Sequence, residues 1–390
     1  MLSLGLGLGL TQTRAGGSRW TPAAIFGPSD TGVLFDARDL RTLFLTSAGI
    51  TNVSTPGQPS GLVLDKSKGL ALGPEVLSNG DFSNDLTGWL DPDGHWSAVG
   101  GGAYHASTSN FSMLLGDVSA SAGKYSQLAF KVSGYGGAAG LRVQFRLADQ
   151  SVITSPSPFS DYAGSSNPAI RADGTYTWRG VVPATAKYIS FARDVFGGGS
   201  AEFTIDSVSL RDVVGFHGAQ PTAGARPTYQ STGLSFDGSD DRLMTTFKPG
   251  LSGTIMSRFN GDAPNRALLG CTLGPNGHAR LVLDSSGRLA AGVGLQSASV
   301  LSAGPDLRNA WHAGAVSWDG TTVKLYLDGS EVYSDAQVGS VNTTVDMAIG
   351  ALNSGGTATG FWSGQISDAL VIDRAATPAE ILKLHNHWSA

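Results

Sequence analysis

Apolar and polar residues alternate strictly along several short stretches of the chain, and this alternation predicts strands rather than helices. In the stretch 141–147, Leu141, Val143, Phe145 and Leu147 face one way and the polar residues between them face the other. Such a pattern is typical of an antiparallel strand with one buried face. No segment between about residues 73 and 213 has a helical period, so this region is predicted to be built from strands.

The stretch 203–210 carries a second alternating pattern that changes parity part of the way along. Phe203 and Ile205 occupy odd positions, whereas Val208 and Leu210 occupy even ones. One extra residue in a strand shifts every following side chain to the other face. We therefore expect a β-bulge near Asp206.

Turn-forming residues divide the last part of the chain into hairpins. The segment Asp284–Gly287 separates two alternating stretches, and Asp319-Gly320 and Asp328-Gly329 interrupt a third and a fourth. Asp-Gly pairs favour tight turns between antiparallel strands. Turns repeated at intervals of about 8–12 residues are typical of a β-sandwich.

Two helices are predicted. Near the C-terminus, Thr377 is placed as an N-cap, Pro378 takes the first helical position, and Glu380 completes a capping box. Ile381, Leu384, His385 and Trp388 then share one face of this helix. A second, short helix is expected around Ala37–Phe44.

Composition supports an all-β fold and excludes several functions. The 390 residues include 54 glycines and 17 prolines, and only 15% are charged. This usage favours short strands and many turns, and the length predicts two or three domains. With 26 Lys and Arg against 31 Asp and Glu, the chain lacks the basic field that nucleic-acid binding requires. No stretch reaches the roughly 18 apolar residues of a membrane helix, so membrane insertion is not expected.

The N-terminal ten residues alternate leucine with glycine. An extended strand of this sequence presents leucine on one face and bare backbone on the other, which favours close approach of another chain. We interpret it as an attachment or trimerisation strand, with residues 1–25 contacting other proteins; a disordered terminus is the alternative. A signal peptide is not favoured, because the first basic residue, Arg14, follows the apolar run.

The C-terminal region resembles the concanavalin A-like jelly rolls of the laminin-G-like and pentraxin-like type. The resemblance rests on the segment Phe236–Asp241, on the hairpins between Trp311 and Gly329, and on Gly364–Arg374 leading into the helix at Thr377. It implies a sandwich with lectin-like loops.

The middle region resembles carbohydrate-binding modules of the jelly-roll kind. The motif Asn79–Phe82, the pair Gly88-Trp89 and the closing strand Ile205–Val208 match the frame of that family. In the family, acidic residues near the opening motif and in the closing strand often hold a structural calcium ion, which implies Asp81 and Asp206 here. The chain departs from the pattern at Ser83 and Ser207. No other cofactor is expected.

Together these resemblances predict two antiparallel jelly-roll β-sandwiches in tandem, with an extended N-terminal attachment segment and a short C-terminal helix. The expected divisions are residues 1–72 for the attachment segment, 73–213 for the carbohydrate-binding-module-like jelly roll, and 214–390 for the concanavalin A-like sandwich.

Two separated segments resemble halves of one segment found in bacteriophage and prophage proteins ahead of a laminin-G-like domain. They are Gly61–Ser67 and His217–Tyr229, so the middle module looks inserted between them. The Leu/Gly start and Phe35–Leu40 also resemble proteins of phage or gene-transfer-agent particles. This resemblance implies a virion protein, such as a tail fibre or head spike, and a homotrimer.

Catalytic chemistry is not indicated. Glycosidases need two carboxylates flanking one bond, yet the two closest of the four glutamates, Glu331 and Glu380, are 49 positions apart in sequence. Aspartate pairs occur in turns, where they serve as turn formers. The single cysteine, Cys271, has no evident base and excludes an intrachain disulfide. We expect a non-enzymatic protein.

Sugar binding remains, because sugar rings pack on aromatic faces while their hydroxyls need amide, carboxylate or guanidinium partners. Core packing is the alternative for Trp96 and Trp178. The candidate glycan contacts are Trp96, Tyr104, Tyr176, Trp178, Asp240, Asp241, Asn353 and Trp362. The predicted partner is a bacterial surface polysaccharide, bound by repeated weak sites. A purely structural particle protein and a secreted polysaccharide-binding or polysaccharide-degrading protein are the alternatives.

Overall fold

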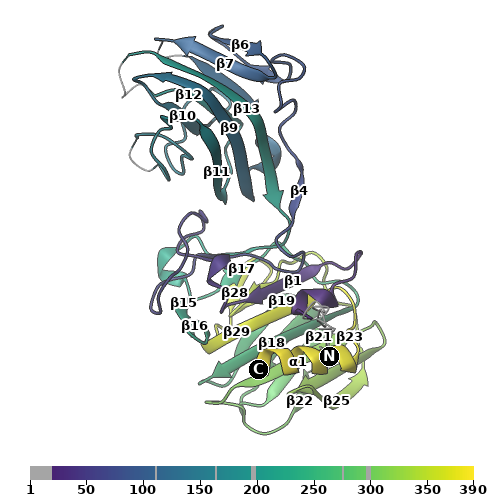
Figure 1. The fold of residues 1–390 in the computed structure, drawn as a ribbon. Helices are drawn as coiled ribbons and strands as arrows, with labels where there is room; N and C mark the ends of the chain where they lie inside the picture. The colour runs from purple at the N-terminus through teal and green to yellow at the C-terminus, as the bar shows by residue number, and fades with distance from the viewer. Residues whose placement is uncertain (1–19, 110–111, 163–164, 195–198, 275, 296–299) are drawn as a thin grey trace, which may run out of the picture.

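The computed structural model describes residues 20–390 except 110–111, 163–164, 195–198, 275 and 296–299. The predicted attachment strand at residues 1–10 lies outside this range. The described chain forms two β-sandwiches that appear as two lobes in Figure 1, which confirms the all-β prediction. None of the described helices combines the length and hydropathy of a membrane span.

The first sandwich is built from residues between Leu72 and Val213. Its smaller sheet has the order β10-β12-β8-β5, formed by β10 (Leu141–Arg146), β12 (Tyr188–Arg193), β8 (Met113–Asp117) and β5 (Trp89–Leu90). Its larger sheet has the order β11-β9-β13-β7-β6, formed by β11 (Gly174–Val181), β9 (Tyr125–Gly137), β13 (Ala201–Val213), β7 (Gly102–Ser107) and β6 (Trp96–Val99), with β4 (Leu72–Glu75) beside β13. All pairs are antiparallel.

The alternating stretches behave as the sequence predicted. Leu141, Val143 and Phe145 are fully buried in the core between the two sheets. The register of β13 against β9 shifts between Asp206 and Ser209, and Ser207 has a φ of 53°. The predicted bulge is therefore confirmed.

The second sandwich uses residues from both ends of the chain. One sheet has the order β15-β16-β29-β18-β23-β24-β25, formed by β15 (Thr228–Gln230), β16 (Gly233–Asp237), β29 (Ser363–Ile372), β18 (Gly253–Gly261), β23 (His312–Trp318), β24 (Thr322–Leu327) and β25 (Ser330–Ala336), with β1 (Gly32–Asp36) beside β29.

The other sheet has the order β2-β3-β14-β17-β26-β19-β20-β21-β22. Its strands are β2 (Leu43–Phe44), β3 (Leu62–Val63), β14 (Gly218–Ala219), β17 (Leu243–Met244), β26 (Ala348–Ile349), β19 (Arg266–Leu273), β20 (Asn276–Leu283), β21 (Leu289–Gly294) and β22 (Val300–Ala303). Beyond this path, β27 (Leu352–Ser354) pairs with β19 in parallel and with β28 (Thr357–Thr359) in antiparallel. The predicted hairpins at Asp284–Gly287 and Asp319-Gly320 join β20 to β21 and β23 to β24.

The residues that were expected to form a separate N-terminal segment lie differently. Strands β1, β2 and β3 belong to the sheets of the second sandwich, and β1 pairs with β29 from Gly32↔Ile372 to Asp36↔Asp368. Val33 and Phe35 are buried in the same core as the C-terminal strands. Since these apolar side chains need a partner sheet, residues 32–64 pack with the C-terminal module, and the first sandwich is inserted between its strands.

The short helix expected around Ala37–Phe44 is reduced to the 3₁₀ turn η2 (Leu40–Thr42). The Asp39 carboxylate accepts a hydrogen bond from the Arg41 N–H, and Leu43 is already extended, with a φ of −106° and a ψ of 130°. Pairing of β2 with β3 thus ends the turn. The described residues also form the 3₁₀ turns η1 (Pro22–Ile25), η3 (Ser119–Ser121) and η5 (Ala223–Ala225).

The C-terminal helix α1 (Pro378–Ser389) has the predicted capping box at Thr377 and Glu380. Its buried face consists of Ile381, Leu384 and Trp388. These side chains pack on the outer face of the sheet that contains β18, β23, β24 and β29, against residues that include Met256, Ala315, Tyr326 and Leu370. The helix thus lies across one sheet (Figure 1), rather than at the end of the sandwich. Arg374 ties it to the N-terminal residues, since its guanidinium pairs with Glu380 at 2.7 Å and with Asp30 at 2.8 Å.

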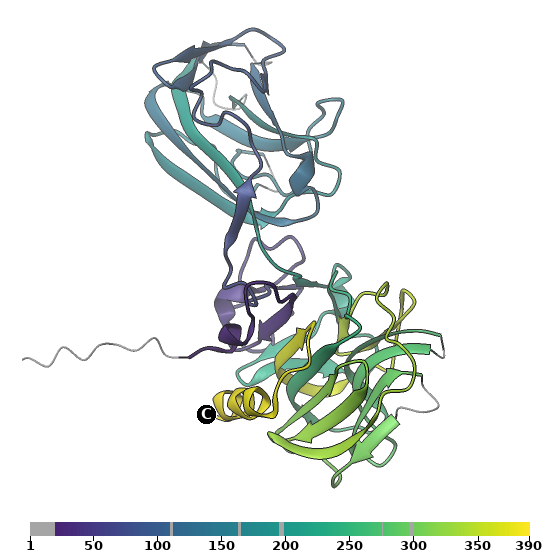
Figure 2. The same ribbon diagram turned by 90° about the vertical axis from the view of Figure 1, so that its right-hand side faces the viewer.

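The two sandwiches meet where the chain enters and leaves the inserted module. In Figure 2, β4 and the end of β13 run side by side between the lobes, and they pair around Arg211↔Glu75. The aromatic ring of Tyr125 crosses the junction, with its centroid 5.4 Å from that of Phe44 and 6.0 Å from that of His217. Tyr125 belongs to a small apolar cluster with Phe44, Leu62, Leu64 and Val213.

A single buried carboxylate holds the strands at this junction together. Asp65 is fully buried, and its oxygens accept hydrogen bonds from the N–H groups of Leu34, Ser67 and Phe216 and from the Ser67 hydroxyl at 2.8–2.9 Å. Gly215, with a φ of 148°, passes so close that a Cβ there would lie 2.8 Å from the Asp65 carboxylate. The Asp65 N–H donates to Nδ1 of His217 at 3.0 Å, so the proton of that imidazole lies on Nε2, which donates to the Val213 carbonyl.

Replacement of Asp65 by asparagine tests this arrangement. The amide would direct its own N–H groups at two of the four donors, which would leave buried donors unsatisfied. We expect a loss of about 2–4 kcal/mol in the free energy of unfolding, measured by urea denaturation. The matched variant Asp206→Asn, at a carboxylate that accepts only from its neighbour Ser207, should cost less than about 1 kcal/mol. Equal effects of the two variants would contradict the assignment.

Candidate functional site

All three predicted glycan-binding tryptophans are buried. Trp96 is 6% exposed and packs against His105 and Phe203, with ring centroids 5.0 and 5.7 Å away. Trp362 is fully buried with its centroid 5.5 Å from that of Phe259. A buried ring presents no open face to a sugar, so neither tryptophan forms the predicted stacking platform. For Trp96 the structure shows the alternative, which is core packing. Large apolar rings contribute most where they are removed from water.

Trp178 differs from the other two because it is both buried and part of a cavity wall. Its ring is 3% exposed and packs edge-on against Phe145 at 5.4 Å. Its indole N–H donates to the Ser166 hydroxyl at 3.4 Å. It therefore lines the cleft described below, but it does not offer a free aromatic face.

The two predicted tyrosines lie far apart on the larger sheet of the inserted module. The Tyr104 hydroxyl donates to Glu202 at 2.8 Å, and this hydrogen bond raises the pKa of Tyr104. The Tyr176 ring stacks on Phe130 at 5.8 Å, and its hydroxyl donates to the Ala172 carbonyl. Because β9 and β13 separate β11 from β7, the structure does not bring these residues into one site.

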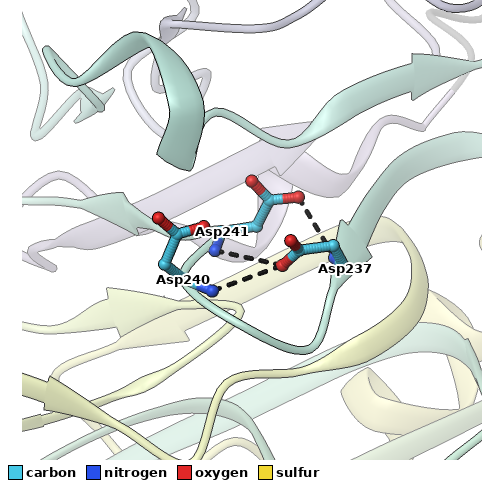
Figure 3. A group of neighbouring side chains, drawn as sticks. All are labelled: Asp237, Asp240 and Asp241. Carbon is cyan, nitrogen blue, oxygen red and sulfur yellow. Dashed lines mark hydrogen bonds between the residues drawn. The ribbon is translucent and has the colours of Figure 1, made fainter.

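The predicted aspartates of the second sandwich form a compact acidic group (Figure 3). Asp237 accepts hydrogen bonds from the N–H groups of Asp240 and Asp241, while its own N–H donates to the Asp241 carboxylate at 3.1 Å. One ligand atom from each of the three residues lies within 4.8 Å of the others, and within the described part of the chain this is the only such group of His, Cys, Asp or Glu. Three carboxylates of this kind suit a hard cation such as Ca²⁺.

The other predicted polar residues serve local structure. Asn353 is 4% exposed; its amide N–H donates to the Asp346 carbonyl, and its oxygen accepts from the Gly356 N–H. Asp81 accepts from Ser83, and Asp206 accepts from Ser207. Neither carboxylate belongs to a group of three His, Cys, Asp or Glu ligands among the described residues. Calcium binding by the protein stays a prediction.

A cleft of about 580 Å³ opens at the junction of the two sandwiches. One wall comes from β11 and the preceding loop of the inserted module, with Ser166, Asn167, Thr177, Trp178 and Arg179. The opposite wall comes from the turn after β2, with Gly49, Ile50, Thr51 and Asn52 and with Arg41 beside them. Tyr125 and Phe44 close the base. The site is therefore formed only when both modules are in place.

Local structure explains why this cleft stays open and keeps its shape. The Val181 N–H donates to the Ala48 carbonyl at 2.8 Å, which fixes the turn against the end of β11. Gly49 has a φ of 68°, and a Cβ at this position would lie 2.7 Å from the Tyr125 ring. Only glycine adopts this backbone so close to an aromatic ring without displacement. The cleft thus has a rigid base.

Polar groups without partners line the opening. The Oδ1 atoms of Asn52 and Asn167 and the Thr177 hydroxyl make no hydrogen bond to any described residue, while the amide N–H groups of the two asparagines are held by backbone carbonyls. Burial raises the pKa of Tyr125 to about 12, so its hydroxyl remains a neutral donor. This set of amide, hydroxyl and guanidinium groups beside aromatic carbon matches the chemistry of a sugar site.

A second hollow of about 570 Å³ continues from the cleft and shares Arg41, Tyr125 and Arg179 with it. Its walls include Leu34, Leu64, Leu70 and Trp388 and the charged residues Asp36, Asp39, Lys66 and Asp368. Lys66 pairs with Asp36 at 3.0 Å and with Asp39 at 2.9 Å. Hydrogen bonds from Arg41 and Lys66 hold the pKa of Asp39 far below its usual range.

Sequence reasoning identified Trp178 but missed Asn52, Asn167, Thr177 and Arg179. Thr177 and Arg179 lie on the exposed, polar face of β11, opposite the face that carries Tyr176 and Trp178. Asn52 comes from a turn of the other module, and no local pattern marks it. The signal that would have pointed to the site is the insertion itself, since binding sites often form where two modules meet.

Comparison with known proteins gives one family match. Residues 256–382 match the model of the concanavalin A-like lectin/glucanases superfamily. This segment runs from β18 to α1 and therefore covers most of the second sandwich. No curated protein matches the chain.

Several solved structures are similar at low identity. Domain 4 of AbnA, a GH43 extracellular arabinanase from Geobacillus stearothermophilus solved with arabinotriose, is 17% identical over 39% of this chain and 76% of its own, with a TM-score of 0.33. The CBM40 of the Ruminococcus gnavus IT-sialidase, bound to α2,3-sialyllactose, is 16% identical over 35% of this chain and 83% of its own, with a TM-score of 0.31. A heptameric SAP-like pentraxin from Limulus polyphemus is 20% identical over 39% of this chain and 80% of its own, with a TM-score of 0.33.

The acidic group of Figure 3 yields a test of pH dependence. Burial, and then repulsion by Asp237, raises the pKa of Asp241 from 3.8 to about 6. Between these values the folded protein binds more protons than the unfolded chain, so this group makes stability fall as the pH rises from about 4 to 6. The loss is about 3 kcal/mol. Asp241→Asn should remove it and stabilise the protein above pH 6.

Thermal unfolding in EDTA at pH 4.5 and 7.5 measures this effect. Burial also raises the pKa of Asp368 to about 6. The difference in stability between wild type and Asp241→Asn therefore measures the contribution of Asp241 alone, because Asp368 is present in both proteins. A variant that is less stable than wild type at pH 7.5 in EDTA would show that the Asp241 carboxylate is stabilised in the folded protein.

Proposed function

We propose that this protein binds carbohydrate without cleaving it, and that the junction cleft is the binding site. The single observation behind this proposal is the cleft itself, in which unpartnered amide oxygens and a hydroxyl flank the aromatic base formed by Tyr125 and Phe44. Its volume of about 580 Å³ lies within the range of about 300–1,000 Å³ that is usual for small-molecule sites. The family match of the second sandwich is consistent with a lectin-like role.

The lack of acid groups in the cleft supports binding rather than hydrolysis. None of its described lining residues is Asp or Glu. Hydrolysis of a glycoside needs two carboxylates about 5–10 Å apart on either side of the bond. The acidic group at Asp237–Asp241 lies instead in the second sandwich, and its carboxylates are held together in one turn.

The finer proposal concerns the biological setting. We propose that the protein is a surface component of a phage or phage-like particle, that it recognises bacterial surface polysaccharide, and that residues 1–25 attach it to other virion proteins. This rests on the sequence resemblance of the Leu/Gly start, of Phe35–Leu40 and of the interrupted segment around residues 61–67 and 217–229. A homotrimer would multiply weak sites and raise the overall affinity. Sedimentation of the full chain tests the trimer, and a monomer would exclude it.

Blocking the cleft tests the binding site. Thr177 is exposed on β11 and has no side-chain partner among the described residues, so Thr177→Trp should fold normally and fill the opening. We expect it to lower the affinity for every bound glycan at least tenfold on a bacterial glycan array. Thr175→Trp, on the same face of the same strand but outside the cleft, serves as the control and should bind like the wild type.

Other outcomes would change the assignment. Unaltered binding by Thr177→Trp would place the sugar site elsewhere. Silence of the wild type across bacterial glycans would favour the structural alternative, and release of reducing ends from a bound polysaccharide would show an enzyme.

A further inference from the structure

The junction cleft is basic although the chain as a whole is acidic. The formal net charge of the protein is −5. The only charged side chains among the described residues that line the cleft are the two arginines, Arg41 and Arg179. Asp36, Asp39 and Asp368 line the neighbouring hollow instead. A cleft with this charge favours an anionic ligand.

The charge of Arg41 is already balanced. Its Nε and Nη2 atoms donate to the two Asp39 oxygens at 2.8 Å each. Lys66 shares Asp39 and also pairs with Asp36. Arg38 joins the same group by pairing with Asp36 and Asp368. The three cations and three carboxylates form a neutral group, which leaves the cleft with the charge of Arg179 alone.

Arg179 has no acidic partner among the described residues. Its Nε donates to the amide oxygen of Gln127 on the neighbouring strand at 2.9 Å, and this contact orients the guanidinium without neutralising it. The two Nη atoms make no hydrogen bond to any described residue. An oriented and unpaired guanidinium offers two parallel donors, which is the geometry that a carboxylate accepts.

We propose that the cleft selects an acidic sugar and that Arg179 binds its carboxylate. This inference rests on the proposed function of the cleft and names its ligand class. The Oδ1 atoms of Asn52 and Asn167 and the Thr177 hydroxyl accept hydrogen bonds from the hydroxyls of the same sugar. An uncharged sugar would leave the Arg179 charge facing the ligand without a partner, which disfavours its binding.

The experiment uses acidic bacterial polysaccharides together with their carboxyl-reduced forms. Reduction converts each uronic acid to the corresponding neutral sugar and changes no other group. Binding of the full chain is measured on an array at two salt concentrations, and the best oligosaccharide pair is then titrated by calorimetry. We expect the acidic form to bind at least tenfold more tightly than the reduced form, and this preference to shrink at high salt.

Three variants separate the charge from the geometry of the contact. Arg179→Gln removes the charge but keeps a side chain that reaches Gln127, so the acidic glycan should bind about tenfold more weakly while binding of the reduced form is unchanged. Arg179→Lys keeps the charge without the two parallel donors and should fall between the two. Lys131→Gln removes a positive charge from the neighbouring strand β9, on the sheet face that also carries Arg179 but outside the cleft. This variant should bind like the wild type.

The outcomes distinguish this inference from the function on which it rests. Equal binding of acidic and reduced glycans, or normal acidic binding by Arg179→Gln, overturns the acidic specificity while the cleft remains a sugar site. A preference for sulfated over carboxylated glycans that Arg179→Gln abolishes also overturns the carboxylate assignment. Absence of binding to every glycan on the array removes both the inference and the proposed function.

Discussion

The buried carboxylate of Asp65 is the constraint on which the rest of this structure depends. It lies at the point where the chain leaves the second sandwich for the inserted module, and it accepts four hydrogen bonds from the strands on either side of that point. A charged group without water is tolerated only when its oxygens are fully satisfied. Because one donor comes from Leu34 and another from Phe216, the carboxylate connects the N-terminal strand to the chain that returns from the insertion.

The position of the inserted module follows from this anchor. The paired segments β4 and β13 lead away from it, and Tyr125 packs back on Phe44 beside it. The cleft at the junction is a consequence, since β11 is held next to the turn at Gly49 by the hydrogen bond from Val181 to Ala48. The proposed binding site therefore belongs to neither sandwich alone. It lies between a polar strand face on one module and a turn on the other.

The parts of the fold that depend on local pattern could be predicted from the sequence. The bulge near Asp206 and the capping box at Thr377 were predicted because the residues that cause them lie within a few positions of each other. The pairing of β1 with β29 was not, since paired residues such as Asp36 and Asp368 lie more than 300 positions apart in sequence. The exposure of two tryptophans was misjudged for a related reason. Trp96 and Trp362 lie near glycine-rich turns in sequence, and only the packed structure shows that Trp96 fills the core of the first sandwich and Trp362 that of the second. The same limit applies to the site, where Asn52 and Arg179 line one cleft from different modules.

The most direct test of the account is to map a bound glycan onto the protein by NMR. Backbone amide shifts would be followed during titration of the perdeuterated full chain with the oligosaccharide that binds best. The account predicts that shifts change together in residues 49–52 and in residues 166–167 and 177–179, on both sides of the junction. Changes confined to the loops around Asp237 and Asp241, with none at the junction, would contradict it.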